Sequence, residues 1–321
     1  VFFPTNCNDQ DFILSILANN GFATKIEKEY NKKVMIRVNY HGLFEDWRMD
    51  EMNAPIGVFD SGVGGLTVVK EIMRQLPAES LVYFGDTARV PYGSKSQKTV
   101  CKYSKQIVRF LQTKQVKAIV VACNTASALA LDEIRADIEI PIIGVVEPGA
   151  IMAANTTRTN NIGIIGTEST IKSGVYSKYL HKINPEITVV SKACPLFVPL
   201  VEEGLWEDRV TEDIAGRYLH EFKEYDIDSL ILGCTHYPLL KRTIGREVGE
   251  NVKLVNPAYE TAKSLKLLLA ENNLLNTLGI EDEEPTYDYY VSDGMEKFIS
   301  FADDVLSCHV NSAEVVDIEA Y

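Results

Sequence analysis

The most informative stretch of this sequence is Ala118–Ala126 (AIVVACNTA), where an apolar run ends at Cys123 and small polar residues follow. A short β-branched run of this kind is typical of a buried strand, and the polar residues after it are typical of a helix N-terminus. The same design occurs again in Ser229–Pro238 (SLILGCTHYP), around Cys234. If the two halves of the chain face each other, the two thiols point into one cleft from opposite sides. That arrangement suits the transfer of a proton from one face of a carbon atom to the other.

Apolar runs alternate with amphipathic runs from residue 54 onward. This alternation predicts parallel sheets with helices on both faces, and such sheets bind ligands beyond the carboxyl ends of their strands, where Cys123 and Cys234 both lie. The expected strands are Ile56–Phe59, Leu81–Phe84, Ala118–Ala122, Ile142–Val146, Ile162–Ile165, Thr188–Val190, Leu230–Leu232, Lys253–Val255 and Tyr289–Val291. The expected helices are Leu66–Gln75, Thr99–Thr113, Ala126–Asp137, Ser173–Lys182, Val210–Glu224, Tyr259–Ala270 and Glu296–Leu306.

We therefore predict an α/β protein of two similar parallel-sheet domains, related by a pseudo-two-fold axis, with the active site in the cleft between them. A weak internal repeat supports this prediction, since Asp60–Gly62 follows the first strand of one half and Gly166–Thr167 follows that of the other. The expected parts are residues 54–149 with 258–321 (first domain), residues 150–257 (second domain) and residues 1–53 (an N-terminal extension of unknown role).

Composition argues against several classes of function. The chain has 321 residues, of which 46% are apolar and 24% charged, so it can bury a sizeable core. Its net charge of −13 and the lack of a basic stripe with interleaved aromatic residues argue against nucleic-acid binding. No apolar stretch approaches the roughly 18–20 residues that span a bilayer, and the acidic Glu281–Glu284 is expected to be a solvated loop. Six cysteines without a C-x-x-C pair indicate neither a disulfide scaffold nor a zinc module, so we expect a cytoplasmic protein with reduced thiols.

The two repeated cysteines are candidate acid–base groups. Backbone N–H groups at a helix N-terminus favour a thiolate and are expected to lower the thiol pKa from its usual ~8.5. His236 follows Cys234 by two residues, which places it to raise the thiolate fraction or to carry a proton. The other four cysteines are expected to be small buried hydrophobic residues: Cys7, Cys101, Cys194 and Cys308.

Further polar segments lie near the expected strand ends. Asp60–Gly65 (DSGVGG) is a glycine-rich turn that matches neither the dinucleotide nor the P-loop pattern, and its aspartate suits an ammonium group better than a phosphate. Pro91–Gly93 lies in a loop at the same edge. Thr167 and Thr170 open a helix, where they either cap it or donate to a carboxylate. The acidic pair Glu202–Glu203 lies either on a surface helix face or at the site.

Together these motifs resemble those of the glutamate racemases, within the wider aspartate/glutamate racemase superfamily. The resemblance covers about residues 54–310, and its most specific part is the pair of cysteine motifs with the Asp-Ser-Gly turn. It implies cofactor-independent interconversion of L- and D-glutamate without a metal, a role in supplying D-glutamate for peptidoglycan synthesis, and a homodimer. The matching segments are Phe59–Leu66, Pro91–Gly93, Val121–Ala126, Gly166–Thr167, Phe197–Glu202 and Leu232–Leu239.

The resemblance also implies roles for individual residues. Cys234 would remove the α-proton of the L-isomer and Cys123 that of the D-isomer, each thiol supplying a proton when the other removes one. Asp60 and His236 match auxiliary acids and bases, and Glu202 matches a further carboxylate. The residues expected to hold the substrate are Asp60, Ser61, Pro91, Tyr92, Gly93, Cys123, Asn124, Thr125, Thr167, Thr170, Cys234, Thr235 and His236.

Four other interpretations remain open from the sequence. An aspartate or hydantoin racemase would share the fold, and separate incubation with L-glutamate and L-aspartate distinguishes these activities. A non-catalytic amino-acid-binding protein would not exchange the α-hydrogen of its ligand in heavy water. A redox protein requires the two sulfurs near the bonding distance of about 2 Å. A pyridoxal enzyme is disfavoured because no lysine follows these strand ends.

Overall fold

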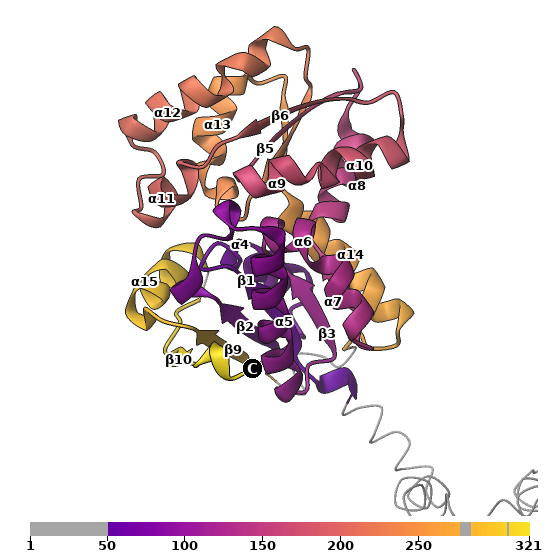
Figure 1. Ribbon diagram of the computed structural model, residues 1–321, viewed down its shortest axis with the longest axis vertical. Coiled ribbons are helices and arrows are strands. Elements are labelled where there is room, and N and C mark those ends of the chain that lie inside the picture. Colours follow the sequence, from indigo (N-terminus) through magenta and orange to yellow (C-terminus); the bar gives the residue numbers. More distant parts are fainter. Residues whose placement is uncertain (1–50, 277–283, 307) are drawn as a thin grey trace, which may run out of the picture. The chain divides into compact units, whose positions relative to one another are not determined.

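The computed structural model describes residues 51–276, 284–306 and 308–321. This part of the chain contains two parallel β-sheets with helices packed against them (Figure 1). The predicted α/β class is confirmed, because every strand pair in both sheets is parallel and the strands alternate with helices along the chain.

The first sheet has six strands in the order β10-β9-β2-β1-β3-β4. Its strand β1 (Ile56–Asp60) is buried along its whole length, as expected for a strand that is covered on both faces. The other strands are β2 (Leu81–Gly85), β3 (Ala118–Val121), β4 (Ile142–Gly144), β9 (Tyr287–Val291) and β10 (Glu314–Val315).

Side chains of β1 alternate between two layers of helices, because successive residues of a strand point to opposite faces. Val58 belongs to one apolar cluster, with residues of α4, α14 and α15. Phe59 belongs to another cluster, with residues of α5, α6 and α7. The bounds are α4 (Leu66–Gln75), α5 (Gln97–Thr113), α6 (Asn124–Leu129), α7 (Leu131–Asp137), α14 (Pro257–Glu271) and α15 (Met295–Val305).

The second sheet has four strands in the order β6-β5-β7-β8. Ile164 packs with residues of α8 and α10, while its neighbour Ile165 packs with residues of α12 and α13. The strands are β5 (Asn161–Gly166), β6 (Thr188–Ala193), β7 (Ser229–Gly233) and β8 (Lys253–Val255). The helices are α8 (Val146–Thr156), α9 (Glu168–Ser173), α10 (Val175–Ile183), α11 (Phe197–Glu202), α12 (Arg209–Leu219) and α13 (Lys241–Val248). The 3₁₀ helices are η1 (Thr87–Arg89), η2 (Tyr92–Ser94), η3 (His220–Glu224), η4 (Tyr237–Leu240) and η5 (Ile318–Ala320).

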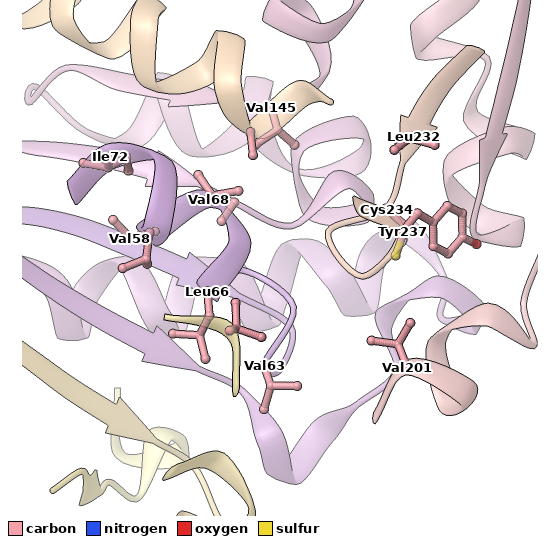
Figure 2. Close-up of a cluster of buried hydrophobic side chains, with 14 of the residues drawn as sticks. Val58, Val63, Leu66, Val68, Ile72, Val145, Val201, Leu232, Cys234 and Tyr237 are labelled. Carbon is pink, nitrogen blue, oxygen red and sulfur yellow. The ribbon is translucent and has the colours of Figure 1, made fainter. Parts of the chain in front are cut away.

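Two helices connect the sheets. The chain leaves the first sheet through α8 and returns through α14, and α14 packs against both α8 and α4. One apolar cluster includes Val58 of β1 and Leu232 of β7, so the core is continuous across both sheets (Figure 2). This continuity holds the carboxyl ends of β1 and β7 close together.

Several predicted elements differ from the observed ones. The strand expected at Ile142–Val146 ends at Gly144, and α8 begins at Val146 because Pro148 is tolerated in a first helical turn. The helix expected at Ala126–Asp137 is interrupted at Ala130. The helix expected from Ser173 begins at Val175, after Gly174 in the left-handed conformation (φ 63°). The helix expected to open at Thr167 is α9, with Thr167 as its N-cap. The sequence reasoning missed α8, α11, α13 and β10.

Some sequence predictions concern residues that the structure does not describe. Residues 1–50 of the expected extension, with Cys7, and residues 281–283 of the acidic stretch lie outside the described residues. The division into residues 54–149 with 258–321 and residues 150–257 remains a prediction, although β1–β4 and β9–β10 form one sheet and β5–β8 form the other. No helix within the described ranges is long and apolar enough to cross a membrane.

Candidate active site

The predicted site residues lie at the carboxyl ends of strands in both sheets. Asp60 ends β1, and Cys123 follows β3 after one residue. Thr167 directly follows β5, and Cys234 directly follows β7. Figure 2 shows the segment with Leu232 and Cys234 opposite the turn that carries Val63. The parallel sheets therefore bring together chemistry that is spread over more than half of the chain.

Both repeated cysteines line one cavity of about 30 Å³. Both are buried free thiols, so the structure contains no disulfide between them and gives no support to the redox interpretation. All the predicted site residues except Asp60 and Thr170 line this cavity, and Gly62, Val90 and Val198 are additional lining residues. The complete lining is Ser61, Gly62, Val90, Pro91, Tyr92, Gly93, Cys123, Asn124, Thr125, Thr167, Val198, Glu202, Cys234, Thr235 and His236.

Asp60 and Thr170 lie directly behind the lining and bond to it. Asp60 is fully buried and accepts hydrogen bonds from the Gly62 N–H (3.1 Å) and from Thr235 Oγ1 (3.5 Å). Thr170 forms a triangle of hydroxyls with Thr125 and Thr167, with O–O distances of 2.9 to 3.2 Å. The three hydroxyls gather donors from both sheets at one wall of the cavity.

Cys123 is the N-cap of α6, as its position in the sequence predicted. Its Sγ accepts from the Ala126 N–H at 3.4 Å, and its thiol donates to Ser61 Oγ at 3.4 Å. The expected lowering of its pKa is wrong, because burial and then the charge of Asp60 raise the pKa of Cys123 to about 12. The hydrogen bonds that Cys123 makes with Ser61 and Ala126 oppose this shift but are outweighed. At neutral pH Cys123 is therefore a protonated thiol.

Cys234 has a different neighbour. Its Sγ lies 3.7 Å from Nδ1 of His236, and Nε2 of His236 lies 3.0 Å from Oε1 of Glu202. Burial alone would lower the pKa of His236, but its hydrogen bonds to Cys234 and Glu202 raise it to about 10. Cys234 precedes the 3₁₀ helix η4 rather than an α-helix. The imidazole of His236 therefore places a hydrogen-bonding and proton-carrying group directly beside this sulfur.

The pKa values of the two carboxyl groups of the site are shifted in opposite directions. Burial raises the pKa of Asp60, although the charge of His236 and the N–H groups of Gly65 and Gly62 partly offset this effect. Burial also acts to raise the pKa of Glu202, but the hydrogen bond and charge of His236 prevail and lower it. Asp60 thus binds its proton more tightly than an ordinary aspartate, while Glu202 is ionised.

The structure separates Glu202 from Glu203, which the sequence did not. Glu202 lines the cavity and its side chain is 22% exposed. The Glu203 side chain is 67% exposed and pairs with Lys297 at 3.1 Å. Only Glu202 is placed to act on His236.

Two glycines allow the two sheets to approach each other closely at the site. A Cβ on Gly64 would lie 2.4 Å from Thr235 Oγ1 and 2.5 Å from Nδ1 of His236. A Cβ on Gly93 would lie 2.6 Å from Cβ of Thr167. Thr67 bridges the same gap, since its hydroxyl donates to the Thr235 carbonyl at 2.9 Å. The sequence reasoning missed Thr67, because nothing local to α4 shows which residue its hydroxyl meets.

A second cavity of about 220 Å³ adjoins the first and shares Gly62, Val90 and Glu202 with it. Among the residues described, no group of three or more His, Cys, Asp or Glu side chains is arranged to hold a metal ion.

The fold and the site define a two-sheet α/β protein in which each sheet contributes one free thiol to a shared cavity. The chain belongs to the Asp/Glu/Hydantoin racemase family, whose sequence pattern matches residues 56–265. It is therefore an isomerase of the racemase class, in agreement with the resemblance seen in its sequence.

Individual relatives are similar over most of their length. The chain is 50% identical over 265 residues to the glutamate racemase of Geobacter metallireducens, and this match covers 83% of the chain and 97% of the relative. Its structure is similar to that of glutamate racemase from Francisella tularensis in complex with D-glutamate, with a TM-score of 0.78, 44% identity, and coverage of 84% and 100%. It is also similar to glutamate racemase from Thermus thermophilus in complex with β-chloro-D-alanine, with a TM-score of 0.76, 44% identity, and coverage of 84% and 99%.

Proposed function

We propose that this protein interconverts L- and D-glutamate without a cofactor, by proton transfer between its two thiols and the substrate. One observation carries the proposal: Cys123 and Cys234 line the same cavity in opposite electrostatic surroundings. Inversion of a carbon centre needs a base on one face and an acid on the other. A thiolate and a thiol provide both before the reaction starts.

In the L-to-D direction, Cys234 removes the α-proton as a thiolate and Cys123 delivers a proton to the opposite face. His236 stabilises the thiolate of Cys234, and Glu202 keeps His236 protonated. In the reverse direction Cys123 is the base. Protonation of the neighbouring Asp60, whose pKa is raised by burial, would remove the negative charge that opposes ionisation of this thiol. Acid–base help of this kind is worth on the order of 10²–10⁴-fold in rate.

The remaining rate enhancement must come from stabilising the carbanion that forms at the α-carbon. Hydroxyl groups and backbone N–H groups around the α-carboxylate do this well where water is excluded. The cavity supplies such donors from both sheets, and the loss of one donor of this type typically costs about 10²–10³-fold in kcat. The hydroxyl donors are Ser61, Thr125, Thr167 and Thr235.

The cleft must widen to admit the substrate. The cavity of about 30 Å³ has space for only about two water molecules, which is less than a glutamate molecule occupies. Gly64, Gly93 and Thr67 lie where the two sheets approach. We infer that these contacts separate on opening and re-form around the bound substrate.

Glutamate is the proposed substrate because the similar structures from F. tularensis and E. coli contain D-glutamate and L-glutamate. The product D-glutamate would supply peptidoglycan synthesis. We propose a cytoplasmic location, which suits the five free cysteines among the described residues, and a homodimer as the working form. Sedimentation of the purified chain tests the dimer.

A direct test follows the optical activity of L-glutamate, D-glutamate and L-aspartate in separate reactions with the purified protein. We expect both glutamate isomers to approach the racemic mixture and L-aspartate to remain unchanged. In heavy water the α-position of glutamate should take up deuterium. If only aspartate is racemised, aspartate and not glutamate is the substrate. If the α-hydrogen of glutamate does not exchange, the chain is a binding protein.

A further inference from the structure

The loop after β2 contains a buried charge that the proposed chemistry does not use. Asp86 is fully buried, and its own N–H donates to the Asp60 carbonyl at 3.1 Å. Its carboxylate accepts from Arg89 Nε at 2.8 and 3.0 Å, from Ser292 Oγ at 2.9 Å, and from the hydroxyl of Tyr92. A buried carboxylate is costly unless it is well paired, so this one holds its partners firmly in place.

Tyr92 connects this charge to the cavity. Its ring is buried and packs against Tyr103, with centroids 5.7 Å apart. Tyr92 and the following Gly93 line the cavity with the two cysteines. Gly93 lies against Thr167 of the other sheet, and the carbonyl of Lys95 accepts from Ser169. The loop therefore spans from the anchor at Asp86 to the opposite wall of the cleft.

Arg89 links the anchor to the end of the chain. Its Nη1 donates to Gln106 and to Glu319, each at 2.8 Å. Its guanidinium lies over the Tyr103 ring, 4.0 Å from the centroid. The Glu319 side chain is 55% exposed, so its ion pair is weaker than the buried one with Asp86.

We propose that Asp86 is a positioning residue that holds the loop 87–95 against the substrate through Tyr92 and Arg89. The proposal depends on the racemase function above, because Tyr92 and Gly93 form a wall of the same cavity. The loop has only two short 3₁₀ turns, η1 and η2, so side-chain bonds rather than a regular helix or strand fix its place. Because Tyr92 and Gly93 form part of the cavity wall, a displaced loop weakens binding of the substrate equally in the ground state and the transition state, which raises KM.

The test compares wild type with Asp86→Asn, Tyr92→Phe and the double variant, using steady-state rates with both glutamate isomers. Asp86→Asn should raise KM for both isomers roughly tenfold, as expected for loss of a charged hydrogen bond, while kcat changes less than about threefold. The double variant should be no worse than Asp86→Asn alone, because both changes break the same link. Glu212→Gln is the matched control, since it breaks the exposed pair with Arg246 and should leave KM unchanged.

Backbone hydrogen exchange gives a measurement that does not need activity. The amides of residues 87–95 should exchange faster in Asp86→Asn than in wild type, while those of α12 should not change. If Asp86→Asn does not fold, Tyr92→Phe and Glu319→Gln should show the same effects on KM and exchange, with Glu319→Gln the weaker.

Two results would overturn the proposal. Unchanged KM and unchanged exchange in residues 87–95, with a lower Tm, would make Asp86 a purely structural charge. A large fall in kcat at unchanged KM would place Asp86 in the chemistry itself. If wild type does not act on glutamate, the proposed function fails, and the exchange comparison still decides whether Asp86 positions the loop.

Discussion

The ends of β3 and β7 carry the same local motif and differ in what surrounds it. A buried cysteine comes shortly after each strand and is followed by polar residues. At the end of β3 the neighbour of Cys123 is a carboxyl group, Asp60, which disfavours its thiolate. At the end of β7 the neighbour of Cys234 is the imidazole of His236, whose pKa is raised to about 10. The motif sets the place of each sulfur and, at Cys234, the neighbouring imidazole; Asp60 of β1 and Glu202 of α11 add the carboxyl groups from other segments.

This difference provides what a two-sided proton transfer needs. If the two thiols were in identical surroundings, the enzyme would populate several protonation states of the pair. Only a state with one thiolate and one thiol could start the reaction. Here the charge of Glu202, from α11, reaches Cys234 through His236. Asp60, from β1, acts on Cys123. The difference between the two cysteine environments therefore depends on α11 and β1, in addition to the two segments that carry the cysteines.

The strongest test removes one sulfur at a time. Cys123→Ser and Cys234→Ser should each lower racemisation by about 10³-fold or more, because each removes the acid or the base on one face. With a glutamate analogue that carries a leaving group on its β-carbon, Cys123→Ser should still eliminate from the L-isomer and Cys234→Ser from the D-isomer. Normal racemisation by either variant would refute the two-thiol mechanism.

The next test exchanges the partner of each sulfur. His236→Asn and Asp60→Asn should each lower kcat/KM by about 10²-fold, because each removes the group that can hold or release a proton beside one of the two sulfurs. The fall must be equal in both directions, because the two enantiomers have equal free energy. The asymmetry should appear in the primary isotope effect of α-deuterated substrate, which should rise more for the L-isomer in His236→Asn and more for the D-isomer in Asp60→Asn. The same response in both variants would contradict the assignment of partners.

A smaller effect is expected from Gly64→Ala. The new Cβ would meet Thr235 and His236 at about the 2.4 to 2.6 Å found for an ideal Cβ, so the Cys234 side must move. We expect kcat/KM to fall about tenfold or more. Gly245→Ala is the control, because its Cβ would meet only Leu254 at an ordinary 3.7 Å. Equal activity of the two variants would show that the close approach at Gly64 is not needed.

The smallest effect on rate, and a distinct effect on pH dependence, is expected from Glu202→Gln. Loss of the carboxylate should lower the pKa of His236 from about 10 toward its ordinary 6.5, so the alkaline limb of kcat/KM should move to lower pH. The raised pKa stabilises the wild-type fold. This stabilisation is complete below pH 6.5 and is lost as pH rises through about 10, and in the variant it should be lost earlier.

Chemical unfolding at several pH values measures the second part of this prediction. Glu203→Gln is the control, since Glu203 is exposed and pairs with exposed Lys297, and this substitution should change neither profile. If the alkaline limb does not shift in Glu202→Gln, then Glu202 does not control the pKa of His236.

Hydrophobic periodicity, together with glycine and proline at the ends of elements, predicted most of the helices and strands well. The helix Leu66–Gln75 has the predicted bounds, because its apolar spacing is strongly amphipathic and a glycine turn precedes it. The helix α8 was missed because its buried residues do not repeat with one clear period and Pro148 lies in its first turn. The six-residue α11, which carries Glu202, is too short to show a period at all.

The sequence by itself determined the strand–helix alternation, the placing of two cysteines at strand ends, and the polar residues beside them, since these depend only on local pattern. Only the tertiary structure decided which charges face each sulfur: Asp60 beside Cys123, and Glu202 behind His236. The reason is physical. The pKa of a buried group depends on desolvation and on charges within a few ångströms, and residues distant in the sequence supply both.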